Sequence, residues 1–159
     1  MIASSCEKEN LSTINPFTDI ANFGKGAYIT LNSTVNLNLN YAAISTSKVS
    51  VKVDAYNNGV TIKEVKLFVV QSSNADPKTW KLIKTVPVSG TTELSVTGAE
   101  IATAIGKTPA ALFAPGQFYT IYNQVVTSDN KTYDVSNTLQ ALEASSNYNS
   151  CFRWTAYVV

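Results

Sequence analysis

Apolar and polar residues alternate with a period of two along most of the chain from Ala27 onward. In residues 49–54 the three valines at odd positions would face a core, and the residues between them would face water. The same alternation makes residues 35–41 a half-buried strand whose odd positions point inward. The pattern therefore predicts an all-β fold. Further strands are expected at 28–31, 65–70, 80–86, 94–96, 113–127, 132–135 and 151–159.

One segment changes from the strand period to a helical one. Thr97 and Glu100 have the spacing of a capping box, in which each side chain bonds the other residue's backbone amide. An apolar face follows over 98–105, and Gly106 can end the helix in a left-handed conformation. We therefore expect one short helix at 98–105, inserted between two strands.

The most informative local motif is a Pro-Gly turn followed by a tyrosine, at Pro115, Gly116 and Tyr119. The tyrosine ring would enter the core while its hydroxyl bonds a backbone group of the preceding turn, which is the tyrosine corner of immunoglobulin-like folds. Across 27–135 the strand order and this motif resemble a fibronectin type III module, with Trp80 as the core indole. We therefore expect an all-β, immunoglobulin-like (fibronectin type III-like) β-sandwich with one short inserted helix.

The pattern divides the chain into three parts. Residues 1–24 lack sustained periodicity and are expected to form a flexible tether. Residues 25–136 are expected to form the sandwich. Residues 137–159 are expected to be an irregular segment, with a helical turn near 139–143, and a terminal strand that leads into a following domain.

The N-terminus carries the one candidate for a covalent modification. Residues 2–5 are apolar and small, Cys6 follows, and residues 7–10 are polar. This resembles the end of a bacterial lipoprotein signal, in which the cysteine is lipidated after cleavage. The alternative is a plain tail with an unpaired thiol.

Several segments together resemble Bacteroidetes-type surface lipoproteins. The resemblance implies a lipid-anchored protein at the outer membrane or cell surface, in the company of glycan-uptake systems and an outer-membrane transporter. The segments are Ser-Cys-Glu-Lys-Glu at the start, Trp-Lys-Leu-Ile-Lys-Thr-Val at 80–86, Leu-Ser-Val-Thr-Gly-Ala-Glu at 94–100, and Asn-Tyr-Asn-Ser-x-Phe-Arg-Trp at 147–154.

Composition argues against several classes of function. The chain has no histidine, so histidine-dependent catalysis and histidine metal sites are excluded. A net charge of +1 gives no field for nucleic acid. The carboxylates are scattered, Cys151 is interpreted as a strand residue, and Asp129, Asn130 and Asp134 offer too few oxygens for calcium. We expect no enzyme activity, no cofactor and no metal.

Carbohydrate is the ligand class with local support. Sugars stack their C–H faces on aromatic rings and hydrogen-bond amide groups. Tyr56 precedes two asparagines, Trp80 follows an Asp-containing loop, and Tyr148 lies between two asparagines. Each ring has an alternative interpretation, in a turn, in the core or beneath a loop.

The sequence thus predicts a non-catalytic module of a bacterial cell-surface lipoprotein. It would act as a spacer or binding domain, with glycan acquisition as its context. The alternative is a fimbrial or adhesin-type subunit that assembles by strand addition, for which the terminal strand at 151–159 would be the donated element.

Replacing Cys6 tests the anchor. A Cys6→Ser variant expressed from the full-length gene is expected to leave the membrane fraction, because the lipidated cysteine is its only expected attachment. Fractionation followed by immunoblotting measures this. If the variant still partitions with membranes, the anchor hypothesis is wrong.

Overall fold

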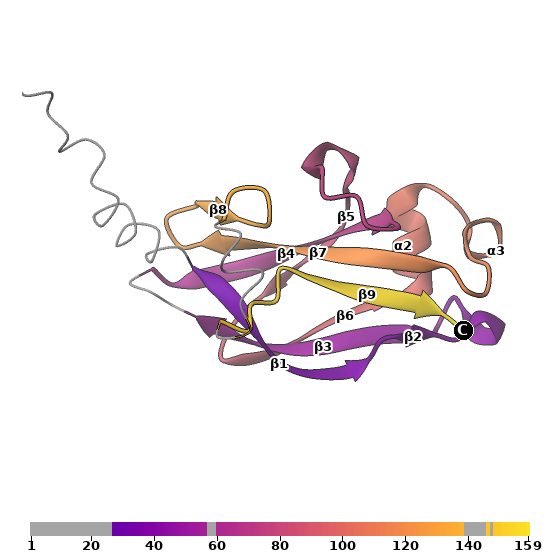
Figure 1. Ribbon diagram of the computed structural model, residues 1–159, viewed down its shortest axis with the longest axis horizontal. Coiled ribbons are helices and arrows are strands. Elements are labelled where there is room, and N and C mark those ends of the chain that lie inside the picture. Colours follow the sequence, from indigo (N-terminus) through magenta and orange to yellow (C-terminus); the bar gives the residue numbers. More distant parts are fainter. Residues whose placement is uncertain (1–26, 57–59, 139–145, 147) are drawn as a thin grey trace, which may run out of the picture.

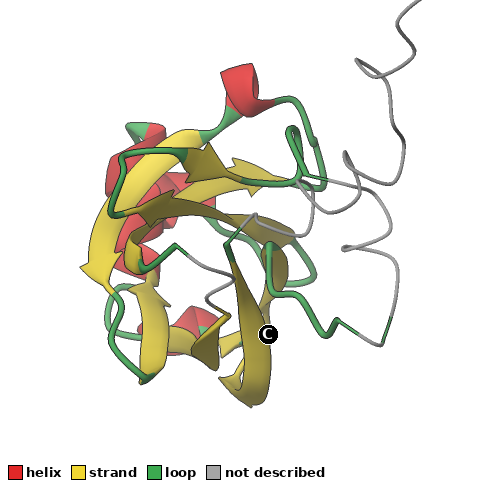
Figure 2. Ribbon diagram, turned by 90° about the vertical axis from the view of Figure 1, so that its left-hand side faces the viewer, coloured by secondary structure: helices red, strands yellow, loops and turns green. Residues whose placement is uncertain are grey.

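The computed structural model describes residues 27–56, 60–138, 146 and 148–159, and these form two β-sheets that face each other (Figures 1 and 2). The expected tether at 1–24, Cys6, residues 57–59 and the expected helical turn at 139–143 lie outside the described residues. The smaller sheet has the order β1–β3–β6, with β1 at Tyr28–Asn36, β3 at Lys48–Tyr56 and β6 at Thr91–Thr97. The larger sheet has the order β2–β9–β7–β4–β5, with β8 beside β7. Its strands are β2 (Asn38–Leu39), β4 (Ile62–Gln71), β5 (Lys81–Pro87), β7 (Phe118–Thr127), β8 (Thr132–Tyr133) and β9 (Arg153–Val158).

The first strand changes sheets, which identifies the topology. β1 pairs antiparallel with β3 in the smaller sheet, and β2, which follows directly, pairs parallel with β9 in the larger sheet. In immunoglobulin lettering the two sheets are A-B-E and G-F-C-C′, with β2 continuing strand A. The expected all-β, immunoglobulin-like sandwich is therefore confirmed.

The inserted helix α2 (Gly98–Ile105) has the expected bounds and both halves of the capping box. Thr97 Oγ1 accepts from the Glu100 amide at 3.2 Å, and Glu100 Oε2 accepts from the Thr97 amide at 2.8 Å. Gly98 has no room for a side chain, because a Cβ there would lie 2.1 Å from the Ile44 carbonyl oxygen. The short helices α3 (Pro109–Leu112), η2 (Tyr41–Ala43) and η3 (Pro77–Thr79) were not expected from the sequence.

The inward faces of the strands agree with the period-two pattern for most of the chain. The valines of β3 and the alternate residues of β4 and β6 are fully buried between the sheets. Residues 35–41 are the exception, because the chain leaves β1, enters β2 and then turns into η2. Leu39 is buried there, but Val35 and Tyr41 are exposed, so the expectation of a single half-buried strand was wrong.

Tyr119 has the geometry of a tyrosine corner. Its side chain is fully buried, and its hydroxyl donates to the Leu112 carbonyl oxygen at 3.0 Å. Gly116 has φ of +82°, a conformation that favours glycine, and its amide donates to the Val158 carbonyl oxygen at 2.9 Å. The turn after Pro115 therefore fixes β7 and also contacts the end of β9.

The boundary expected at residue 136 lies too early. β9 pairs with β7 from Phe118 to Tyr122, and its alternate residues are buried in the core. The sandwich therefore extends to Val158. The strand that the alternative of strand addition relied on is paired inside its own domain.

Trp80 is not the indole of the central core. That position belongs to Trp154 of β9, whose Nε1 donates to the buried Asn123 Oδ1 at 3.2 Å. Trp80 instead stacks on Tyr122, with ring centroids 4.2 Å apart and planes 8° apart. Since Tyr119 and Ile121 face the core, Tyr122 faces the outer side of the larger sheet, and Trp80 covers it there.

Substitutions at Tyr119 test the corner. Tyr119→Phe is expected to lower the free energy of unfolding by about 1 kcal/mol through the lost hydrogen bond. Tyr119→Ala is expected to lower it by about 3 kcal/mol or more through the cavity. Urea denaturation measures both, and Tyr157→Phe at an exposed ring is the control, with no expected change. A neutral Tyr119→Ala substitution would contradict the core assignment.

Candidate functional site

Three tyrosines from distant parts of the chain meet at the edge of the smaller sheet. Tyr28 begins β1 and is paired with Tyr56 at the end of β3, and their rings stack with centroids 4.5 Å apart and planes 28° apart. Tyr148 precedes β9, and its ring stands edge-on to Tyr28, with a centroid distance of 6.4 Å and planes 86° apart. We call Tyr28, Tyr56 and Tyr148 the tyrosine cluster.

Strand geometry explains the position of the first two rings. Ile29 and Ala55 pack toward the core, so their neighbours Tyr28 and Tyr56 face the outer side of the smaller sheet. Tyr28 also packs against the buried Phe152, with ring centroids 6.5 Å apart. Tyr28 therefore forms the base of the tyrosine cluster.

Tyr148 reaches the cluster because the segment before β9 runs along β1. The Leu31 amide donates to the Asn149 carbonyl oxygen at 2.8 Å, and the Cys151 amide donates to the Ile29 carbonyl oxygen at 2.8 Å. These bonds form an antiparallel bridge between Thr30 and Ser150. The ring of Tyr148 is thereby placed beside a strand that lies more than one hundred residues earlier in the chain.

The three rings differ in exposure, with one buried ring at the base and two exposed rings beside it. Tyr28 is buried, whereas Tyr56 is 45% exposed and Tyr148 is 44% exposed. Burial and then the neighbouring Tyr56 and Tyr148 raise the pKa of Tyr28 above its usual value. Its hydroxyl therefore stays protonated at neutral pH and remains able to donate a hydrogen bond.

Polar side chains continue the same face beyond the cluster. Asp54 lies two residues before Tyr56 and so shares its face of β3. Its Oδ1 accepts from the Thr91 hydroxyl at 2.5 Å, and its Oδ2 accepts from Asn32 Nδ2 at 2.9 Å. Thr30 is paired with Asp54 and lies beside Tyr28 on the same face. Aromatic rings and oriented polar groups are therefore adjacent.

Trp80 does not belong to this surface, which corrects its place among the candidate glycan-binding residues. It is only 7% exposed, and its Nε1 donates to the Asn74 carbonyl oxygen at 3.1 Å. One ring face is covered by Tyr122, and Phe68 lies 5.9 Å away between centroids. Of the three predicted rings, the structure brings together Tyr56 and Tyr148.

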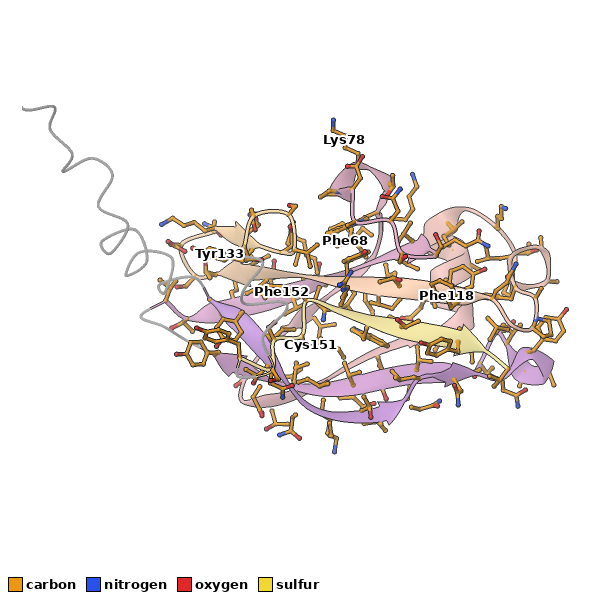
Figure 3. All side chains as sticks on the ribbon, viewed as in Figure 1. Phe68, Lys78, Phe118, Tyr133, Cys151 and Phe152 are labelled. Carbon is orange, nitrogen blue, oxygen red and sulfur yellow. The ribbon has the colours of Figure 1, made fainter. Side chains whose placement is uncertain are left out.

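A second exposed aromatic pair was missed by the sequence analysis. Phe118 and Tyr157 are paired residues of β7 and β9, with centroids 6.4 Å apart, and they are 38% and 47% exposed. They lie on the outer face of the larger sheet, toward the end of the sandwich that holds Val159 (Figure 3). The signal was available, because Phe118 precedes the inward-facing Tyr119 and must point outward.

Cys151 and Asp134, which the sequence raised as chemical candidates, have structural surroundings. Cys151 is buried, and that burial raises the pKa of its thiol to about 12 despite a bond from Asn123. Asp134 is buried and accepts from Gln124 Nε2 at 2.7 Å and from the Ser136 amide at 2.9 Å. Within the described residues no group of three or more acidic or cysteine side chains is placed to hold a metal.

Helices long and apolar enough to cross a membrane are absent from the described ranges. No protein-family model and no curated protein matches the chain. Among solved structures, the chain is similar to murine CRIg, at 13% identity over 67% of this chain and 89% of that one, with a TM-score of 0.30. The fold assignment rests on the strand order and on the tyrosine corner described above.

The reactivity of the Cys151 thiol tests whether this side chain is buried in the folded protein. In a Cys6→Ser background, its reaction with a thiol reagent at pH 8 is expected to be about a thousandfold or more slower than that of an unperturbed cysteine, because the thiolate is the reacting form. One equivalent should react after denaturation. Rapid labelling of the folded protein would contradict the buried, protonated state.

Proposed function

We propose that this chain is a non-catalytic, immunoglobulin-like binding module of a cell-surface lipoprotein, and that it binds glycans at the tyrosine cluster. The observation that carries the proposal is the convergence of Tyr56 and Tyr148 over Tyr28. Both rings are nearly half exposed, whereas Tyr28 and the Phe152 ring that packs against it are buried. Exposed aromatic side chains that gather in one place are typical of interaction sites.

The surroundings of the rings favour a sugar over a purely apolar ligand. A pyranose presents C–H groups on its faces and hydroxyls around its rim. Tyr56 and Tyr148 offer ring surface for the C–H groups, and the Asp54 carboxylate on the same face accepts hydrogen bonds from hydroxyls. The Thr30 hydroxyl donates to the Asp54 carbonyl oxygen at 3.3 Å and can still accept a hydrogen bond. By contrast, the paired residues next to Phe118 and Tyr157 are two threonines, and one of these, Thr120, is buried and bonded to the Ser72 carbonyl oxygen.

The proposed cellular setting combines this surface with the sequence at Cys6. A lipid-anchored cysteine would attach the chain to the outer membrane, and the residues after it would connect the anchor to β1. A triacylated cysteine would hold more firmly than a single acyl chain, which binds membranes weakly and reversibly. The role of the module would then be to hold glycan at the cell surface for an uptake system with an outer-membrane transporter.

Ring substitutions test the proposed function. An array of bacterial, plant and host glycans first identifies a bound oligosaccharide, and calorimetric titration then compares variants with it. Tyr56→Ala and Tyr148→Ala are each expected to weaken binding about tenfold, which corresponds to about 1.4 kcal/mol of lost contact. The loss follows from the missing stacking surface.

Tyr157→Ala is the matched control, since Tyr157 is equally exposed but lies on the other sheet. It should leave affinity unchanged. A blank array, or an equal loss in the control and in the two cluster variants, would refute the proposal.

A further inference from the structure

Asp54 is the ionisable side chain nearest the tyrosine cluster along β3. It lies two residues from Tyr56 on the same face, and a strand advances about 3.3 Å per residue. The carboxylate and the exposed ring are therefore separated by about 6.6 Å along the strand, which is the scale of one pyranose ring. A sugar stacked on Tyr56 would bring its rim hydroxyls toward Asp54.

The carboxylate is held in one orientation by its neighbours. Thr91 binds Oδ1 and Asn32 binds Oδ2, so the group is fixed from both flanking strands, β6 and β1. These hydrogen bonds, that from Thr91 first, lower the pKa of Asp54 below its usual value. Asp54 therefore stays ionised at neutral pH.

An ionised carboxylate accepts hydrogen bonds and cannot donate them. It has about four acceptor positions, of which two are occupied here by Thr91 and Asn32. With respect to the described part of the chain, each oxygen therefore keeps one acceptor position for a further donor. Two adjacent hydroxyls of a sugar supply such a pair of donors, and charge-assisted bonds of this kind are the stronger ones.

Beyond Asp54, the charged side chains of the smaller sheet are Lys48, Lys52 and Glu93, and all three lie farther along the strands from the rings. Lys52 and Glu93 are paired in the next row of the sheet, and Glu93 also accepts from Lys48 Nζ at 3.0 Å. Of the charged side chains of the smaller sheet, that of Asp54 lies nearest the rings, and its charge is negative. A ligand carboxylate or sulfate placed on the rings would meet that charge at short range and would be disfavoured.

From this arrangement we infer that the tyrosine cluster and Asp54 together select uncharged sugars with two adjacent free hydroxyls and reject acidic sugars. The inference rests on the proposed function and adds a ligand class to it. Asp54 acts as a specificity-determining residue: it accepts from the two hydroxyls of a neutral sugar, and its charge opposes a uronic acid. The rings supply contact area for either kind of sugar.

Matched pairs of oligosaccharides test the inference. β-1,4-Mannan oligosaccharides are compared with β-1,4-mannuronate oligosaccharides, and β-1,4-glucan with β-1,4-glucuronan, because each pair differs only in oxidation at C6. The broad array described above extends the comparison to other neutral and acidic glycans. The wild-type protein is expected to prefer neutral members by about tenfold or more.

Asp54→Asn removes the charge and nearly preserves the shape of the side chain. It is expected to weaken binding of the neutral sugar about tenfold. The ratio of the affinities for the neutral and the acidic member of each pair is expected to fall toward one. Glu93→Gln is the matched control, since it removes a negative charge one row farther from the rings and should leave the ratio unchanged. Circular dichroism and thermal unfolding confirm that both variants fold.

The outcomes separate the inference from the proposed function. Suppose that glycans bind and the tyrosine variants lose affinity, but Asp54→Asn keeps the wild-type ratio of neutral to acidic affinities. The inference about Asp54 is then wrong, and the proposal of glycan binding is retained. A wild-type preference for the acidic members would also overturn the inference. If no glycan binds, the proposed function fails and takes the inference with it.

Discussion

The hydrogen bonds between β1 and the segment before β9 are the constraint on which the molecule depends most. Residues 149–151 bond β1 in the smaller sheet, and β9, which follows at once, pairs with β7 in the larger sheet. At the other end of the same edge, β1 continues into β2, which pairs with β9. The continuation of β1 into β2 and the segment that leads into β9 therefore each connect the two sheets. The same bonds set Tyr148 beside Tyr28, so the architecture and the candidate site have one cause.

Period-two alternation and local turn chemistry were sufficient to predict the core of the fold. The valines of β3, the capping box of α2 and the turn before Tyr119 each depend on residues that are close in sequence, and each was found as expected. The errors arose where long-range pairing decides the outcome. Residues 35–41 alternate well, but the change of sheet after β1 exposes Val35 and Tyr41. The terminal strand looked unpaired because its partner, β7, lies some thirty residues earlier.

The candidate site shows the same division. Local chemistry singled out Tyr56 and Tyr148, but their convergence requires the bridge from Thr30 to Ser150, which no local pattern encodes. Tyr28 was overlooked, although it directly precedes the inward-facing Ile29 in the strand and must therefore lie on the outer face. Trp80 had suitable neighbours in sequence, yet the ring is covered because the loop before β5 folds it onto Tyr122. Local composition therefore identified candidate rings, and tertiary pairing decided which of them reach solvent.

The most direct test of this account is a nuclear Overhauser measurement on the protein bound to a neutral oligosaccharide. The account predicts intermolecular contacts from sugar C–H protons to the ring protons of Tyr56 and Tyr148, together with contacts between those rings and Tyr28. Sugar contacts to Phe118 and Tyr157 in place of the tyrosine cluster, or a Tyr148 ring without contact to Tyr28, would contradict it.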